Sequence, residues 1–164
     1  MNPSLLKKLT LAALLAGTIF TAQAALKVGD TLPDLVSFKL EGKIPKSLEG
    51  KVVIMSFWAS SCRPCVRLFP VLEELQKKFG SRLVVVAVNV DEKRANMDNF
   101  LKKHPVAVII LRDSKQKLAA VVEPAAMSTT FILDGEGKVR FLHNDFHGEE
   151  TRKQYFSEVE ALLK

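Results

Sequence analysis

A buried strand that leads directly into a pair of cysteines is predicted by the segment Val52-Val53-Ile54-Met55-Ser56-Phe57-Trp58-Ala59-Ser60-Ser61-Cys62-Arg63-Pro64-Cys65. If a helix begins at Cys62, this sulfur lies among free backbone N–H groups at the positive end of the helix dipole, which favours the thiolate. Pro64 fits the first helical turn, and Arg63 adds a positive charge beside the sulfur. The thiolate is the form that attacks disulfides, so this segment predicts a redox site at Cys62 and Cys65.

Two other uses of the cysteine pair are less consistent with the sequence. A static cross-link is disfavoured, because so short a loop constrains the unfolded chain little. A zinc site would have to recruit His143 and His147 from far downstream, and the chain has only 2 cysteines. Disulfide exchange is therefore the preferred interpretation.

The residues around the cysteines also resemble a known family. Phe57–Cys65 is similar to the F-W-A-x-W-C-x-P-C signature of thioredoxin-like thiol-disulfide oxidoreductases of the exported TlpA/ResA type. Further similar stretches, at Val28–Asp34, Leu48–Lys51 and Thr129–Lys138, extend the resemblance over nearly all of the mature chain. The resemblance implies an α/β protein with a thioredoxin fold: an N-terminal β extension and a central mixed sheet flanked by helices.

The first residues predict export. Two lysines precede an apolar run from Leu9 to Phe20, and Ala22-Gln23-Ala24 has the small-x-small pattern of a cleavage site. We expect residues 1–24 to be a Sec signal peptide, and residues 25–164 to be one thioredoxin-like domain in the periplasm. Retention of the apolar run as a membrane anchor is the alternative.

The charge of the chain argues against one class of partner, nucleic acids. The net charge is +6 at pH 7, which is ordinary for solubility, and the basic residues form no stripe with interleaved aromatics. We therefore expect no nucleic-acid binding. We also expect a monomer without a bound cofactor or metal.

The rest of the chain alternates predicted strands and helices, which is typical of an α/β architecture. Polar and apolar residues alternate over Leu35–Leu40, which predicts an edge strand that turns at Glu41-Gly42-Lys43. Apolar residues recur at helical spacing from the cysteines to Phe79. Leu83–Val88 is apolar without alternation, as expected of a central strand that pairs in parallel beside the strand ahead of the cysteines.

Downstream, Asp91 is expected to cap a helix that ends near His104-Pro105. The remaining predicted elements are a strand at Val106–Leu111, a short helix at Lys117–Val122, a hairpin of Phe131–Leu133 with Val139–Leu142, and a last helix at Glu149–Leu163.

The resemblance gives the cysteines their roles and names the residues that shape the site. Cys62 would attack a substrate disulfide and Cys65 would resolve the mixed disulfide, in a site shaped by Trp58, Arg63, Pro64, Met127, Ser128 and Thr129. The favoured direction is reduction. The expected partners are disulfides of exported proteins, such as an apocytochrome c, with a membrane thiol-transfer protein as the electron donor.

Three departures from the family pattern concern the site. Ser128 stands where the family usually has a cis-proline, and a cis bond before serine is costly, so we predict a trans Met127–Ser128 peptide. Ser56 and Leu68 stand at the two places where such proteins carry a buried acid, which leaves Cys65 without an obvious general base. Ser61 replaces a tryptophan and exposes the Cys62 sulfur.

The first departure supports a rival function. A serine hydroxyl near two thiols could admit Cu(I) or Zn(II), which would make the protein a copper chaperone and not an enzyme. However, the exported copper-delivery proteins of this fold carry C-x-x-x-C, whereas this chain has C-x-x-C.

Overall fold

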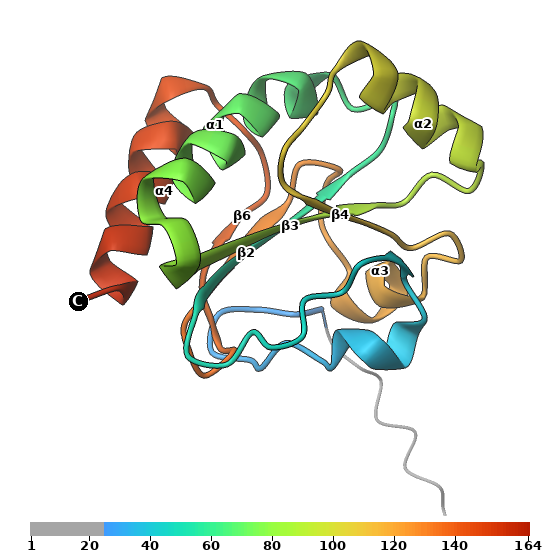
Figure 1. Cartoon of the computed structure of the whole chain (residues 1–164). Helices are drawn as coiled ribbons and strands as arrows, with labels where there is room; N and C mark the ends of the chain where they lie inside the picture. The colour runs from blue at the N-terminus through green and yellow to red at the C-terminus, as the bar shows by residue number, and fades with distance from the viewer. Residues whose placement is uncertain (1–24) are drawn as a thin grey trace, which may run out of the picture.

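The computed structural model describes residues 25–164, so the predicted signal peptide lies outside the described residues. Six strands form one mixed sheet in the order β1-β4-β3-β2-β5-β6 (Figure 1). The strands are β1 (Glu41–Gly42), β2 (Val52–Trp58), β3 (Leu83–Asn89), β4 (Ile109–Arg112), β5 (Thr130–Leu133) and β6 (Val139–His143). The three central strands β2, β3 and β4 run parallel, and β1, β5 and β6 pair antiparallel with their neighbours.

Helices cover both faces of the sheet, which confirms the predicted mixed sheet flanked by helices (Figure 1). The α-helices are α1 (Arg63–Phe79), α2 (Arg94–Lys103), α3 (Lys117–Val122) and α4 (Glu149–Leu162). Side chains of α1, α2 and α4 pack into one hydrophobic cluster, and side chains of α3 and the N-terminal segment pack into the other. None of these described helices is both long and apolar enough to cross a membrane.

The site lies at the carboxyl edge of the two central strands. All seven residues of β2 and all seven of β3 are buried, as the unbroken apolar runs predict for strands covered on both faces. The parallel register pairs Val52 with Leu83 and Trp58 with Asn89, so both strands end at the same level. The cysteines follow β2 directly and therefore lie at this edge.

The predicted strand at Leu35–Leu40 is wrong. Leu35–Phe38 forms a 3-10 helix, because the Asp34 side chain accepts a hydrogen bond from the backbone N–H of Val36 and turns the chain. Leu35 and Leu40 would lie on opposite faces of a strand, yet both are buried, whereas Val36 is exposed, so the alternation does not mark one face of a strand.

The N-terminal β extension is instead the short edge strand β1, which depends on a glycine. Gly42 has φ of 117°, and a Cβ there would lie 2.6 Å from the Ile110 carbonyl oxygen of β4. At the preceding residue, the Glu41 carboxylate accepts hydrogen bonds from Arg112 Nη2 (2.8 Å) and Nε (3.1 Å). Because Gly42 has no side chain, its backbone can approach β4 closely, and β1 can pair along this edge of the sheet.

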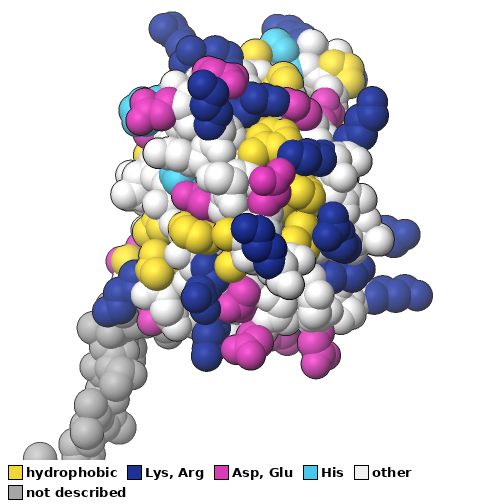
Figure 2. Space-filling view, turned by 90° about the vertical axis from the view of Figure 1, so that its left-hand side faces the viewer, with side chains coloured by type: hydrophobic (Ala, Val, Ile, Leu, Met, Phe, Trp, Pro, Cys, Tyr) yellow, Lys and Arg dark blue, Asp and Glu magenta, His cyan; other side chains and the backbone are white. Residues whose placement is uncertain are grey.

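The surface over α4 carries mixed charge. Figure 2 shows lysine and arginine side chains spread over this face among acidic and hydrophobic ones, without a single basic patch. Nearby contacts explain part of the mixture: Lys78 pairs with Glu160 at 2.6 Å, and Arg152 pairs with Glu74 and lies over the Phe156 ring. Basic and acidic side chains are therefore interleaved on this face.

Candidate active site

The two cysteines form a disulfide at the start of α1. Cys62 is the residue before the helix and Cys65 lies in its first turn, with Pro64 between them. Arg63, the first helical residue, is exposed. Cys62 retains 8% of its surface exposed and Cys65 only 1%. A substrate sulfur can therefore approach Cys62, while Cys65 is reached only from within the protein.

The loop that carries Cys62 is tied to the neighbouring strand by Asp91. The Asp91 carboxylate accepts hydrogen bonds from the backbone N–H and the hydroxyl of Ser60, both at 2.9 Å. It also accepts one at 2.8 Å from the amide of Asn89, at the end of β3. Asp91 was predicted to cap the following helix, but that helix begins at Arg94. Since Asp91 follows a central strand, its position at the carboxyl edge could have indicated this role.

Trp58 forms the floor of this loop. Its ring packs edge-on against Phe69 of α1, with centroids 5.2 Å apart, and at a tilt against Phe100 of α2, with centroids 4.9 Å apart. Its indole N–H is buried without a hydrogen-bond partner among residues 25–164. Helices α1 and α2 are thus joined through one aromatic cluster directly beneath the cysteine loop.

The loop before β5 faces the disulfide with a carbonyl group. The Met127 carbonyl oxygen lies 3.3 Å from Cys65 Sγ and 3.6 Å from Cys62 Sγ. Neither sulfur carries a proton in the disulfide, so these are contacts and not hydrogen bonds. In the reduced protein the same oxygen can accept a thiol proton, which favours the thiol form of the cysteine that donates it.

The Ser128 hydroxyl donates to Asp145 Oδ1 at 3.1 Å, and the Met127–Ser128 peptide is trans, as predicted. Asp145 Oδ1 also accepts the backbone N–H of Phe146 at 2.7 Å. These two donors, the backbone one first, hold the pKa of Asp145 below its ordinary value. The structure therefore directs the serine hydroxyl to a carboxylate, whereas the Met127 carbonyl faces the sulfurs. No sequence signal connects Ser128 with Asp145.

Behind this loop, hydroxyls occupy one of the positions where the family resemblance would place a buried acid. Thr130 Oγ1 donates to Ser56 Oγ at 2.9 Å, and the Phe57 N–H donates to the Thr129 carbonyl at 2.9 Å. The other position, Leu68, is apolar and buried. Both positions are therefore uncharged.

Two of the histidines, His143 and His104, contact side chains other than the redox pair. His143 Nε2 is 2.8 Å from Glu158 Oε2 on α4, and the His104 ring packs at a tilt against Phe100. Within residues 25–164, no three side chains of His, Cys, Asp or Glu come together as a metal site. The zinc site that would join His143 and His147 to the cysteines is therefore not formed by the described residues.

A cysteine pair at the N-terminus of the helix that follows a central β-strand, faced by the loop before an antiparallel strand, defines a redox protein of the thioredoxin class. Comparisons with known proteins agree. A model of the thioredoxin-like family matches residues 50–139. The chain belongs to this thioredoxin-like family.

Individual relatives narrow the class. The chain is 31% identical over 143 residues to the thiol-disulfide oxidoreductase ResA of Geobacillus thermodenitrificans, covering 85% of this chain and 82% of that protein. It is 32% identical over 124 residues to ResA of Bacillus subtilis, covering 74% and 69%. The crystal structure of a putative thiol:disulfide interchange protein DsbE from Chlorobium tepidum superposes with a TM-score of 0.77 at 32% identity, covering 85% of this chain and all of that one. The protein is a thiol-disulfide oxidoreductase with a thioredoxin fold.

Proposed function

We propose that this enzyme reduces disulfides of exported proteins, with Cys62 as the attacking and Cys65 as the resolving cysteine. The observation that carries the proposal is the unequal access to the two sulfurs at the start of α1. The more accessible cysteine, Cys62, lies at the positive end of the helix dipole beside Arg63, which favours its thiolate. The buried Cys65 Sγ lies slightly closer to the Met127 carbonyl oxygen, at 3.3 Å against 3.6 Å for Cys62 Sγ.

The reaction consists of two exchanges. The Cys62 thiolate attacks one sulfur of the substrate disulfide; a Cys62–substrate disulfide forms and the other substrate sulfur leaves as a thiolate, which takes up a proton. Cys65, after losing its proton, attacks Cys62 Sγ. The Cys62–Cys65 disulfide forms and the second substrate sulfur is released. Two electrons pass from the protein to the substrate.

The oxidised enzyme produced in this way needs a reductant. We propose that a membrane thiol-transfer protein returns the electrons, and that the substrates include an apocytochrome c. The relatives named ResA and DsbE support exchange with disulfide substrates. Residues 1–24 have the pattern of a Sec signal peptide, which supports placement in the periplasm.

The test is to trap the mixed disulfide. A Cys65→Ser variant keeps the attacking thiol and lacks the resolving one, so it should accumulate covalent adducts with substrate proteins in periplasmic extract, identified by mass spectrometry. A Cys62→Ser variant is the matched control and should capture none. Equal capture by both variants, or capture by neither, would contradict the assigned roles.

The direction of electron flow is tested by the reduction potential of the Cys62–Cys65 pair, titrated against glutathione and dithiothreitol buffers. A potential near or below about −220 mV supports reduction of other proteins. A potential near about −120 mV would instead make the protein an oxidant of their thiols.

A further inference from the structure

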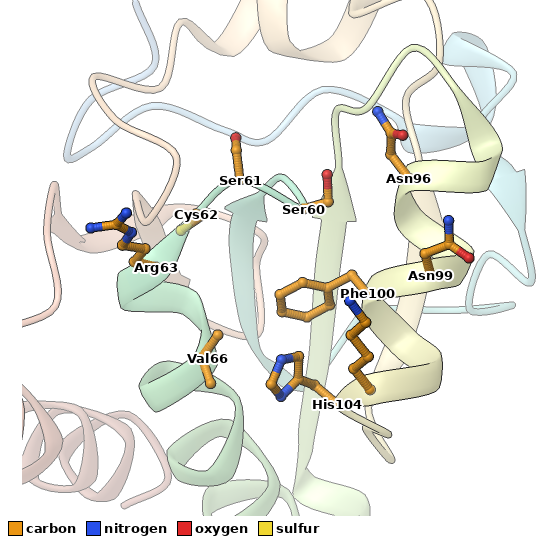
Figure 3. A pocket seen from close by; sticks show the side chains of 10 residues that line it. Ser60, Ser61, Cys62, Arg63, Val66, Asn96, Asn99, Phe100 and His104 are labelled. Carbon is orange, nitrogen blue, oxygen red and sulfur yellow. The ribbon is translucent and has the colours of Figure 1, made fainter.

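A pocket of about 380 Å³ opens beside Cys62, between the cysteine loop and α2. Figure 3 shows Ser61 and Cys62 at one end of it, His104 toward the other, and the Phe100 ring between them. The lining residues are Ser60, Ser61, Cys62, Arg63, Val66, Asn96, Asn99, Phe100, Lys103 and His104. The attacking cysteine, Cys62, therefore borders a pocket that is also lined by side chains of α2.

One wall of the pocket is a continuous face of α2. Asn96, Asn99, Phe100 and Lys103 recur at spacings of three and four residues, which places them on one side of the helix. Asn96, Asn99 and Lys103 are exposed, whereas Phe100 is 7% exposed and rests on the Trp58 cluster. The wall thus offers two amides and one ammonium group around an aromatic floor.

The charge of the pocket has one sign. None of the lining side chains is acidic, and Lys103 and Arg63 are cationic. Figure 3 shows the Arg63 guanidinium directed away from Phe100, so Lys103 is the cation on the α2 wall. The nearby acids have other partners: Asp91 binds Ser60, and Asp98 lies 3.6 Å from Arg94. Among residues 25–164, no salt bridge involves Lys103.

We propose that this pocket binds the segment that flanks the attacked cysteine of a substrate protein, and that it selects a carboxylate side chain in that segment through Lys103. The proposal rests on the proposed disulfide exchange and adds its substrate class, which is a disulfide with a neighbouring acidic residue. The Asn96 and Asn99 amides can donate to and accept from an extended peptide backbone. Phe100 supplies an apolar surface for the intervening side chain.

The length of the α2 wall limits how many residues of an extended substrate peptide can lie along it. Asn96 and Lys103 are seven residues apart, which is about 10 Å along a helix axis. An extended peptide rises about 3.3 Å per residue, so this wall spans about three residues. We therefore place the test carboxylate three residues from the attacked cysteine, within the length of peptide that this wall can hold.

The experiment uses three synthetic peptides with one intramolecular disulfide, identical except for Glu, Gln or Lys three residues from the attacked cysteine. Second-order rate constants for their reduction by the reduced mature protein are measured at low and at physiological salt. We expect the Glu peptide to react about two- to fivefold faster than the Gln peptide, the range of a partly exposed ion pair. The Lys peptide should be slowest, and added salt should reduce the preference.

Two variants distinguish an effect of the pocket on the peptide preference from an effect of the net charge of the protein. Lys103→Glu should reverse the order of the Glu and Lys peptides. Lys102→Glu makes the same change of charge on the same helix, one residue away and outside the pocket lining, and should keep the wild-type order.

The outcomes distinguish this inference from the exchange function. If all three peptides are reduced at the same rate by the wild-type protein, or if Lys102→Glu changes the order as much as Lys103→Glu does, the pocket does not select a carboxylate. In both cases disulfide reduction itself stands. If none of the peptides is reduced, while dithiothreitol reduces each of them, the exchange function and the inference fall together.

Discussion

Two loops meet over the disulfide, and different interactions hold them in place. The cysteine loop, from Trp58 to Cys65, ends in a helix and rests on aromatic side chains. The facing loop, from Ala126 to Thr129, is held by polar contacts such as Ser128 with Asp145 and Ala126 N–H with Thr129 Oγ1. Aromatic packing, together with the hydrogen bonds of Ser60 to Asp91, therefore holds the loop that carries the nucleophile, whereas the loop that presents a carbonyl to it is held mainly by hydrogen bonds.

The largest effect on activity is expected from removal of the nucleophile on the cysteine loop. In Cys62→Ser we expect no turnover in a disulfide reduction assay, because a hydroxyl does not form a disulfide with the substrate. The fold should persist, since the serine still fits the position before α1. The assay is paired with an unfolding curve under reducing conditions. Residual turnover by this variant would show that Cys65 attacks on its own.

The packed loop is tested next by Trp58→Ala. Loss of the ring removes contacts with Phe69 and Phe100, and we expect the free energy of unfolding to fall by about 3–5 kcal/mol. Chemical denaturation of the oxidised protein, followed by circular dichroism, measures this change. A loss below about 1 kcal/mol would show that packing does not hold the cysteine loop.

The polar loop should respond less. Ser128→Ala removes the hydroxyl that donates to Asp145, and we expect a loss of about 1 kcal/mol with a rise in the pKa of Asp145 toward its ordinary value. Denaturation and NMR titration of the Asp145 carboxyl measure the two effects. Ser157→Ala on α4 removes an exposed hydroxyl that donates to the Gln154 carbonyl, and serves as the control with little change.

The smallest expected effect is the loss of stability in acid that follows from the lowered pKa of Asp145. Because the folded-state pKa of Asp145 is lowered, its carboxylate stabilises the folded protein at neutral pH, and this contribution is lost as the pH falls from about 5 through the lowered value. Asp145 is exposed, so the contribution should be about 0.5 kcal/mol or less. The stability of wild type relative to Asp145→Asn should therefore shrink as the pH falls. A difference that grows in acid would contradict this account.

The two loops also differ in how far the sequence predicts them. Strand β2, the start of α1 and the cysteine pair follow from a continuous segment, since an apolar run and helix-start residues act locally. The sequence does not predict the 3-10 helix at Leu35–Phe38, because apolar and polar residues alternate over Val36–Leu40 as in a strand, although Val36 is 65% exposed in the structure. The Ser128–Asp145 contact joins residues 17 positions apart, from the ends of two strands. Such a contact depends on the register of a hairpin, which composition and spacing do not contain.

The short strand β1 affects whether molecules of this protein associate with one another. With only two residues, it covers the outer edge of β4, and it does so because Gly42 leaves room for the Ile110 carbonyl. A larger residue there would push β1 away and leave backbone groups of β4 unpaired. Unpaired edges recruit strands from other molecules, so this glycine protects the protein against aggregation at high protein concentration.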